Sequence, residues 1–391
     1  MKIVFICGSL EDGKDGVGDY TRRLGRKLVE NGYSIGIMAL HDQYVNDKPW
    51  EEEEEPSMRT LRLPAYLTWE RRTSLAADFV RSVDPEWISL QFVGFAYQRY
   101  GLPLGLSPLV KKVSKNRQLH MMFHELWCGM SASAPIKEVV LGKLQYWFLR
   151  MMLATLKPDK VFTNIERYEG RLKKLGEQPL LVPVFSNIPL ASHVSDISWE
   201  EVIAKSNLQD LVTGVDNKLV LGFFGSIYLI PGFTALIQNA YDAACRLGRE
   251  CCILLIGNNA KEDLERLSGH DLKPRVFELG MQSPGIINRA MALVDFGVIT
   301  TPIDGINKSG GAAAWMERGI PVLVSGEDPT DNGNDLRAAC GAYRVKCEED
   351  VVEALLHGNR NRQNKERLDG VAEVYMRHLF HKKAAYLHED S

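Results

Sequence analysis

Apolar residues follow two alternating periods along the first half of the chain. A continuous β-prone run at 2–7 precedes a polar, glycine-rich loop, and helical periodicity at 17–30 precedes a second β-prone run at 33–40. This order predicts a βαβ unit. Further elements are predicted in the same alternating order, a helix at 75–83, a strand at 87–92, a helix at 108–115 and a strand at 119–123. Strands that alternate with helices predict a parallel sheet covered on both faces.

The same alternation restarts after residues 191–216, a stretch rich in Ser, Asp and Asn that we expect to connect two halves. The elements predicted beyond it are strands at 218–223, 251–256, 276–279, 296–300 and 321–324, and helices at 233–247, 261–267, 285–293 and 310–318. The sequence thus predicts two doubly wound α/β domains at 1–190 and 217–360, followed by a helical tail at 361–391. Because open parallel sheets bind ligands at the carboxyl ends of their strands, we expect a ligand in a central cleft between the domains.

Composition narrows the class of protein. The chain has 391 residues, 45% hydrophobic and 25% charged, which excludes a disordered, collagenous or disulfide-scaffold protein. The formal net charge of -3 offers no electrostatic footprint for nucleic acid, so we expect no nucleic-acid partner. The seven cysteines show no paired spacing and the N-terminus no leader pattern, which favours reduced thiols and a cytoplasmic protein.

Two biased segments leave a surface question open. The acidic run at 51–55, closed by Pro56, predicts a solvated loop. The longest apolar region, 139–156, is interrupted by Lys143 and Arg150, which argues against a helix that spans a membrane. Its aromatic residues at 146–148 fit either a helix lying on a bilayer surface or packing in a core, and both alternatives stay open.

Two glycine-containing turns follow predicted strands. Gly16 and Gly18 lead into the first helix, where amides at a helix start can approach an anion. Because a third glycine is missing at Thr21, the loop does not fit a dinucleotide fingerprint, and its glycines could equally shape only a turn. Gly225 and Ser226 follow the strand at 218–223, where phosphate contact and close strand-to-helix packing are both consistent with the pattern.

The segment 300–311 is the strongest candidate anion site. Its Pro, Asp-Gly and Gly-Gly pairs predict an extended loop that ends at a helix start. Free amides from Ser309 to Ala312 would then face an anion, while Lys308 supplies a full charge and Ser309 a hydroxyl donor. The spacing does not match a Walker loop, and a purely structural role remains the alternative.

His124 follows the strand predicted at 119–123, so it should lie at the carboxyl end of the first sheet. There it could donate to a sugar hydroxyl or handle a proton, or be satisfied by the neighbouring backbone. No His, Asp and Glu cluster has metal-ligand spacing and no nucleophile elbow is present, so we expect no metal and no cofactor.

Taken together, these motifs resemble the family 4 (group 1) glycosyltransferases of the GT-B fold. The matching stretches are those at 16–24, 123–127, 184–189, 222–226 and 279–302, and the Gly-Ile-Pro-Val at 319–322. The resemblance implies transfer of a sugar from a nucleotide diphosphate donor, a UDP- or GDP-sugar, usually with retention and without a required metal. It further implies that the second half binds the donor and the first half a glycan or lipid-linked acceptor, in polysaccharide biosynthesis. Peripheral membrane contact stays open because of the aromatic residues at 146–148 and not because of the resemblance.

The resemblance also implies roles for particular residues. His124 matches the histidine that contacts the donor sugar, and Lys308 stands as a second catalytic candidate. The remaining donor-binding candidates are Gly16, Gly18, Gly225, Ser226, Met281, Gln282, Asp304, Gly305, Asn307, Ser309 and Gly310.

The sequence departs from the family at two places. Residues 226–232 contain no basic residue where the family carries Arg and Lys, and the second carboxylate of the family's Glu pair is missing, with Ala314 or Ala312 at its position. Lys308 is a hypothetical replacement for the lost diphosphate cation. Two other functions therefore stay open, a non-catalytic nucleotide-sugar-binding protein and a nucleotide-sugar epimerase.

Overall fold

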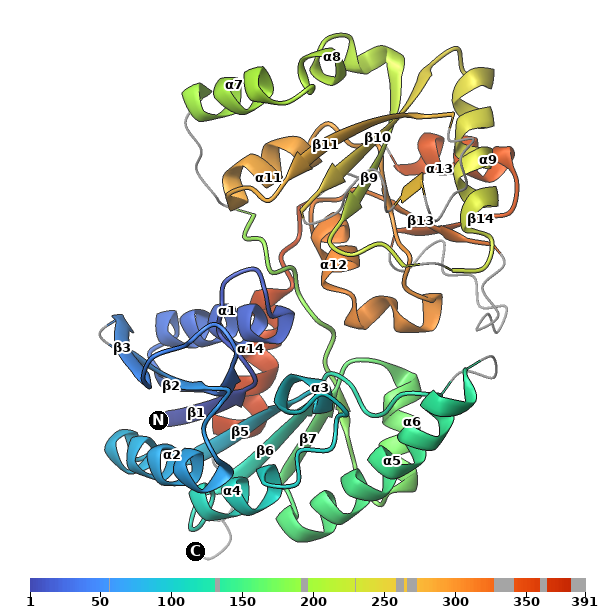
Figure 1. Cartoon of the computed structure of the whole chain (residues 1–391). Coiled ribbons are helices and arrows are strands. Elements are labelled where there is room, and N and C mark those ends of the chain that lie inside the picture. The colour runs from blue at the N-terminus through green and yellow to red at the C-terminus, as the bar shows by residue number, and fades with distance from the viewer. Residues whose placement is uncertain are drawn as a thin grey trace, which may run out of the picture. The chain divides into compact units, whose positions relative to one another are not determined.

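The computed structural model describes residues 1–55, 57–130, 134–190, 196–228, 230–257, 264–265, 273–326, 341–358 and 364–380. The chain divides into two compact units. The first contains Met1–Val184 and Leu368–Ser391, and the second contains Phe185–Arg367 (Figure 1). Each unit has its own sheet and its own core.

The sheet of the first unit has the order β3-β4-β2-β1-β5-β6-β7-β8, and every neighbouring pair is parallel except β3 and β4. Its strands are β1 (Lys2–Cys7), β2 (Ser34–Asp42), β3 (Trp50–Glu55), β4 (Met58–Pro64), β5 (Trp87–Phe92), β6 (Gln118–Phe123), β7 (Lys160–Thr163) and β8 (Leu180–Leu181). Its helices are α1 (Gly16–Glu30), α2 (Trp69–Val83), α3 (Gly94–Tyr97), α4 (Leu106–Val113), α5 (Ile136–Leu156), α6 (Glu166–Lys174) and α14 (Leu368–Tyr375).

The predicted βαβ alternation is confirmed in this unit, with one correction. The acidic run forms β3, which pairs antiparallel with β4, and is not the solvated loop that the sequence predicted. Charged residues are common on edge strands, where they hinder pairing with another sheet. The hydrogen bonds that make this segment a strand come from β4, so charge patterning alone missed it.

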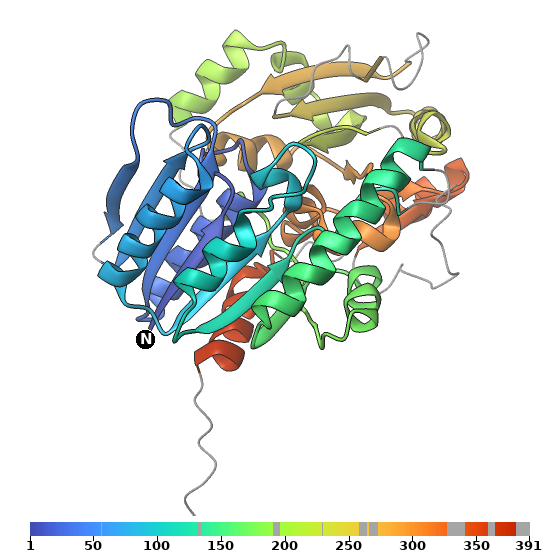
Figure 2. The same ribbon diagram turned by 60° about the horizontal axis from the view of Figure 1, so that its bottom comes forward.

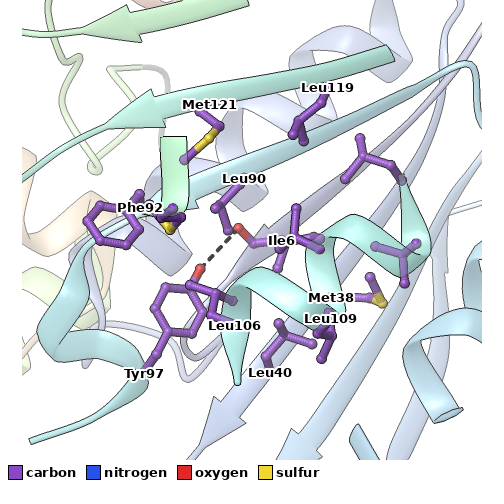
Figure 3. Packing of buried hydrophobic residues seen from close by; sticks show 14 of the residues in the cluster. Ile6, Met38, Leu40, Leu90, Phe92, Tyr97, Leu106, Leu109, Leu119 and Met121 are labelled. Carbon is purple, nitrogen blue, oxygen red and sulfur yellow. Dashed lines mark hydrogen bonds between the residues drawn. The ribbon is translucent and has the colours of Figure 1, made fainter. Parts of the chain in front are cut away.

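Helices cover both faces of the first sheet. Side chains of α2, α4, α5 and α6 join one face of the sheet in a single apolar cluster, part of which Figure 3 shows around Tyr97, whose hydroxyl donates to the Ile6 carbonyl at 3.4 Å. On the other face α14 lies beside α1, and Tyr375 of α14 contacts the ring of Phe5. The predicted tail is thus helical at α14, continues as the short π-helix η3 (Met376–Phe380), and completes the first unit. The rest of the tail lies outside the described residues.

The second unit contains a parallel sheet with the order β11-β10-β9-β12-β13-β14. Its strands are β9 (Lys218–Phe224), β10 (Glu250–Ile256), β11 (Arg275–Gly280), β12 (Phe296–Val298), β13 (Val322–Ser325) and β14 (Ala342–Val345). Its helices are α7 (Asp196–Lys205), α8 (Gln209–Val212), η1 (Val215–Asn217), α9 (Phe233–Arg246), α11 (Pro284–Met291), η2 (Ile303–Lys308), α12 (Gly310–Glu317) and α13 (Glu348–Gly358). Of the helix predicted at 261–267, all but 264–265 lies outside the described residues.

The stretch at 191–216, which the sequence predicted to connect two halves, includes the helices α7 and α8 and belongs to the second unit. Leu208 and Leu211, beside and within α8, are fully buried in the core of the second unit. The segment before it is fixed by Arg318, whose guanidinium donates to the Ile188 carbonyl at 3.0 Å and to Asn288 Oδ1 at 2.9 Å. Residues 185–190, which the sequence placed in the first domain, therefore belong to the second unit.

The described thiols and helices bear on two further expectations. Cys7, Cys251 and Cys252 are buried, whereas Cys245 and Cys347 are exposed, and all five are free thiols. Of the helices in the described part of the chain, none combines the length and the hydropathy needed to cross a bilayer.

Candidate functional site

Three adjacent strands of the second unit end in glycines with left-handed backbone. Gly225 after β9, Gly257 after β10 and Gly280 at the end of β11 have φ of 81°, 100° and 69°. The Gly225 N–H donates to the Ile256 carbonyl at 3.3 Å, and the Gly257 N–H donates to the Gly280 carbonyl at 2.9 Å. Because residues with a Cβ are strained at these angles, the glycines let all three strands turn at the same edge of the sheet. Sequence reasoning missed Gly257, although a glycine directly after an apolar run signals such a turn.

The start of α12 lies against the first of these turns. A Cβ at Gly311 would come within 3.0 Å of the Phe224 carbonyl oxygen, so only glycine fits there without a shift. On the other side of the turn, Tyr228 N–H donates to Thr300 Oγ1 at 3.1 Å. The structure therefore brings the Gly225 turn and the 300–311 segment together.

The 300–311 segment is more compact than the extended loop that the sequence predicted. Residues 303–308 form the 3-10 helix η2, and Ser309 N–H donates to the Ile306 carbonyl at 3.1 Å. Ser309 then caps α12, because its Oγ accepts a hydrogen bond from Ala312 N–H at 3.2 Å. The predicted run of four free amides is therefore wrong. Of the four amides from Ser309 to Ala312, those of Gly310 and Gly311, the first two residues of the helix, have no hydrogen bond to a residue that the structure describes.

The other candidates of this segment differ in exposure. Gly305 is buried, and the stem of Lys308 passes beside it, with Cε 3.7 Å from where a Gly305 Cβ would lie. Lys308 is partly buried at the end of η2, two residues before Gly310. Asp304 is partly buried as well, whereas Asn307 is exposed. Lys308 is therefore a cationic residue close in sequence to the open amides, at the end of the helix that precedes them.

Met281 and Gln282 directly follow Gly280 at the end of β11, the edge strand of the sheet. Met281 is 53% exposed, and Gln282 Nε2 donates to the Leu279 carbonyl at 3.2 Å. Both lie at the same sheet edge as Gly225, with β10 between their strands. Ser226 directly follows Gly225 and is partly buried. The second unit thus collects all of its candidate residues at one edge.

His124 lies at the carboxyl edge of the first sheet, where its backbone N–H donates to the Phe92 carbonyl at 3.1 Å. Its Nε2 lies 2.9 Å from Gln91 Oε1, and the centre of its ring lies 4.9 Å from that of Tyr20, with the two ring planes at 77°. Burial lowers the pKa of His124 to about 3, so the imidazole is neutral at neutral pH. A neutral ring that donates through Nε2 leaves Nδ1 as an acceptor. His124 is therefore suited to hydrogen bonding with a hydroxyl group and not to acting as a charged acid.

A buried polar chain holds His124 in place. Gln91 Nε2 donates to Ser89 Oγ at 2.9 Å, and Ser89 Oγ lies 2.8 Å from Nδ1 of His120. Burial also lowers the pKa of His120 to about 3. Sequence reasoning missed Ser89 and Gln91, although two polar residues at alternate positions of a buried strand share one face and indicate a network.

The first glycine loop holds carboxylates where the sequence suggested open amides. Asp15 caps α1, and its Oδ1 accepts from Val17 N–H and Gly18 N–H, both at 2.9 Å. Gly18 is buried, and a Cβ there would clash with the Ser9 carbonyl. Gly16 is exposed at the start of α1. The helix start in the first unit is therefore closed by an acidic side chain of the protein itself.

Asp19 adds a second carboxyl group to this loop and accepts from Gly13 N–H at 3.2 Å. Burial raises the pKa of Asp15 above its usual value and that of Asp19 to about 6. Among the described residues, no group of three or more His, Cys, Asp or Glu side chains is placed to hold a metal ion.

The fold is shared with solved structures across nearly the whole chain. A glycosyltransferase from Rickettsia africae covers 96% of this chain and 93% of its own, with a TM-score of 0.53 and 11% identity. An alpha,alpha-trehalose 6-phosphate synthase from Burkholderia multivorans matches with a TM-score of 0.53 and 10% identity. The match covers 96% of this chain and 94% of the synthase. A UDP-GlcNAc 2-epimerase from Methanocaldococcus jannaschii matches with a TM-score of 0.53 and 12% identity. The match covers 96% of this chain and 99% of the epimerase. No family model and no curated protein matches the chain. The chain thus has the fold of two Rossmann-like domains known as GT-B.

Proposed function

We propose that this protein is a glycosyltransferase that moves a sugar from a nucleotide diphosphate donor, UDP- or GDP-linked, to a glycan or lipid-linked acceptor. One observation carries the proposal. The open amides of Gly310 and Gly311 lie beside the Gly225 turn and are preceded by Lys308. This combination of helix start, glycine turn and cation suits a diphosphate group.

The proposed reaction makes negative charge grow on the leaving diphosphate. Fixed amides and a nearby cation stabilise that charge more in the transition state than in the ground state. Loss of one such donor typically costs about 3 kcal/mol of transition-state stabilisation. Lys308 would supply the charge that the family's missing Arg and Lys supply elsewhere, Ser226 would contact the diphosphate, and Met281 and Gln282 would contact the base.

The first unit would contribute His124 and the acidic loop. A neutral imidazole whose Nε2–H is held by Gln91 can accept a hydrogen bond through Nδ1 from a hydroxyl of the donor sugar. Because Asp15 already occupies two amides of the first loop, we assign that loop to acceptor hydroxyl groups and not to phosphate. In this proposal Gly16 and Gly18, which the resemblance places near the donor, lie in the loop assigned to the acceptor. Retention, independence of metal and a place in polysaccharide biosynthesis remain as the resemblance implies them, and a cytoplasmic location remains as the thiols and the N-terminal stretch predict it.

Calorimetry with UDP-, GDP- and ADP-sugars, followed by a transfer assay, tests the proposal. We expect one donor class to bind, with release of the nucleoside diphosphate only when an acceptor is present. Failure of every donor to bind would overturn the proposal. The matched reference is the same titration with the free nucleoside monophosphate, which lacks the second phosphate and should bind more weakly.

Two observations favour alternative functions. Residues 226–232 lack a basic residue, and Ala312 and Ala314 stand where the family has its second carboxylate, which favours donor binding without turnover. The fold is also that of a UDP-GlcNAc 2-epimerase. An epimerase would convert the sugar nucleotide into a new one with no acceptor present. The same two assays separate these alternatives from transfer.

A further inference from the structure

Helix α5 of the first unit is apolar on two opposite sides. One side packs into the core with Gln145, Phe148, Leu149, Met152 and Leu153, all of them buried. On the other side, five large apolar residues each expose more than half of their surface. They are Ile136 (83%), Val140 (54%), Leu144 (55%), Trp147 (55%) and Met151 (59%). Their spacing of three and four residues places them on one face of the helix. We call these five residues the α5 stripe.

Such a stripe is unusual on the surface of a globular protein. Scattered exposed apolar residues are common, whereas a continuous row of them marks an interaction surface. Figure 2 shows α5 as the long green helix along the outside of the first unit. The sequence left two interpretations open for this segment, and the structure gives Phe148 to the core and Trp147 to the surface.

The charged residues of α5 that flank the stripe have one sign. Lys137, Lys143 and Arg150 are exposed beside it, and the Arg150 guanidinium lies 5.1 Å from the centre of the Trp147 ring. None of the three forms an ion pair with another residue that the structure describes. Glu138, the acidic residue of α5, lies two positions from Val140 and therefore about 160° away around the helix.

Aromatic and basic side chains extend one edge of the stripe toward α6. The rings of Trp127 and Tyr146 form a T-shaped pair with their centres 5.2 Å apart. Those of Tyr146 and Trp147 form a second T-shaped pair with their centres 5.7 Å apart. Arg171 of α6 lies over the Trp127 ring at 5.5 Å. Aromatic rings and long basic side chains with apolar stems are the residue types that favour the boundary between lipid headgroups and acyl chains.

We propose that the α5 stripe docks on an anionic bilayer surface. The apolar residues would enter the boundary region, while Lys137, Lys143 and Arg150 would meet the negative headgroups. Charge complementarity favours lipid over a second copy of the chain, because two such faces would oppose like charges without an acidic partner on the stripe. The proposal concerns docking alone and does not depend on the proposed transfer reaction.

Sedimentation with vesicles of phosphatidylglycerol and phosphatidylcholine tests the docking. The wild-type chain should bind these vesicles and bind pure phosphatidylcholine much less. The variant Leu144→Gln/Trp147→Gln/Met151→Gln should bind at least about tenfold more weakly, because it loses the apolar residues that enter the bilayer. The control Leu247→Gln/Leu356→Gln removes exposed apolar residues of the second unit and should bind like the wild type.

Charge neutralisation gives a second test. Lys143→Gln/Arg150→Gln should weaken binding by roughly fivefold for each cation removed, and added salt should weaken the wild type in the same direction. Two results would overturn the proposal: no binding of the wild type to the anionic vesicles at low salt, or equal loss in the control. A wild-type dimer that the stripe variant dissociates, without vesicle binding, would assign the stripe to a second copy.

Trp147→Phe keeps the apolar character and provides a readout that does not depend on folding defects. Brominated lipids should quench the fluorescence of the wild type more than that of this variant, while both bind vesicles equally. Equal quenching would show that Trp147 stays outside the bilayer and would contradict the docking. Vesicle binding without transferase activity would reject only the proposed function, and activity without binding would reject only the docking.

Discussion

The glycine loops of the two units begin alike and end differently. Each follows a strand and leads into a helix, α1 in the first unit and α12 in the second. At α1 the cap is Asp15, whose carboxylate takes the amides of Val17 and Gly18. At α12 the cap is Ser309, a neutral hydroxyl that takes only the Ala312 amide and leaves those of Gly310 and Gly311 open.

We infer from this difference that a helix start can take an anion only when its cap leaves amides free. The partial positive charge is present at both helices. At α1 a full negative charge of the protein already meets it, so a phosphate there would face a carboxylate. At α12 the cap is neutral, and Lys308 adds a positive charge nearby. The cap residue therefore decides which of the two similar loops is the better diphosphate site.

Replacing the neutral cap of α12 by a carboxylate should have the largest effect on donor binding. Ser309→Asp keeps a good helix cap but sets a carboxylate at the open amides. We expect donor affinity to fall by more than about a hundredfold, because like charges at a desolvated contact cost several kcal/mol. Ser309→Asn is the isosteric neutral control and should stay within a few-fold of the wild type. Calorimetry measures both, and equal affinity of the two variants would contradict the comparison.

Removing the nearby cation should come next. Lys308→Ala should lower turnover by about a hundredfold, since the loss of one stabilising group costs on the order of 3 kcal/mol. Lys205→Ala, at an exposed position of α7, serves as the control. The measurement is transfer to the acceptor at saturating donor. Unchanged turnover would remove Lys308 from the mechanism.

Changing the glycines of α12 tests the geometry instead of the charge. Gly311→Val should cost about 1–3 kcal/mol of folding stability and weaken donor binding, because its side chain must displace the Phe224 carbonyl. Gly310→Ala is the matched control, since no atom lies within 4 Å of the added Cβ. It should leave stability unchanged or raise it by up to about 1 kcal/mol. Thermal unfolding and donor titration would show whether the two positions differ as expected.

The acidic loop of the first unit predicts a smaller, pH-dependent effect. Asp19 has a pKa of about 6 in the folded chain against 3.8 in its ordinary state, so the folded chain holds this proton more tightly. Folding stability should therefore fall as pH rises from about 4 to about 6, by about 1 kcal/mol after allowing for solvent screening. Asp19→Asn should flatten the decline in that window. A decline of the same size in Asp19→Asn would assign it to other groups.

Much of the fold was predictable because each element carries a local pattern. The strand at 87–92 and the helix that begins at Phe233 were predicted from periodicity, and both are confirmed. The edge strand β3 was missed because its hydrogen-bond partner, not its own pattern, makes it a strand. The site was partly predictable as well. Its glycines stand out in the sequence, whereas the positioning of His124 by Gln91 depends on neighbouring strands.

The sequence by itself determined much of the succession of helices and strands, most of the glycines at strand ends and the charge of each loop, because these depend on short stretches of chain. Only the tertiary structure decided which groups find partners. It showed that Asp15 closes one helix start while Gly310 and Gly311 stay open at another, and that α5 buries Phe148 and exposes Trp147. Burial and hydrogen bonding are set by neighbours distant in sequence, and no local pattern contains that information.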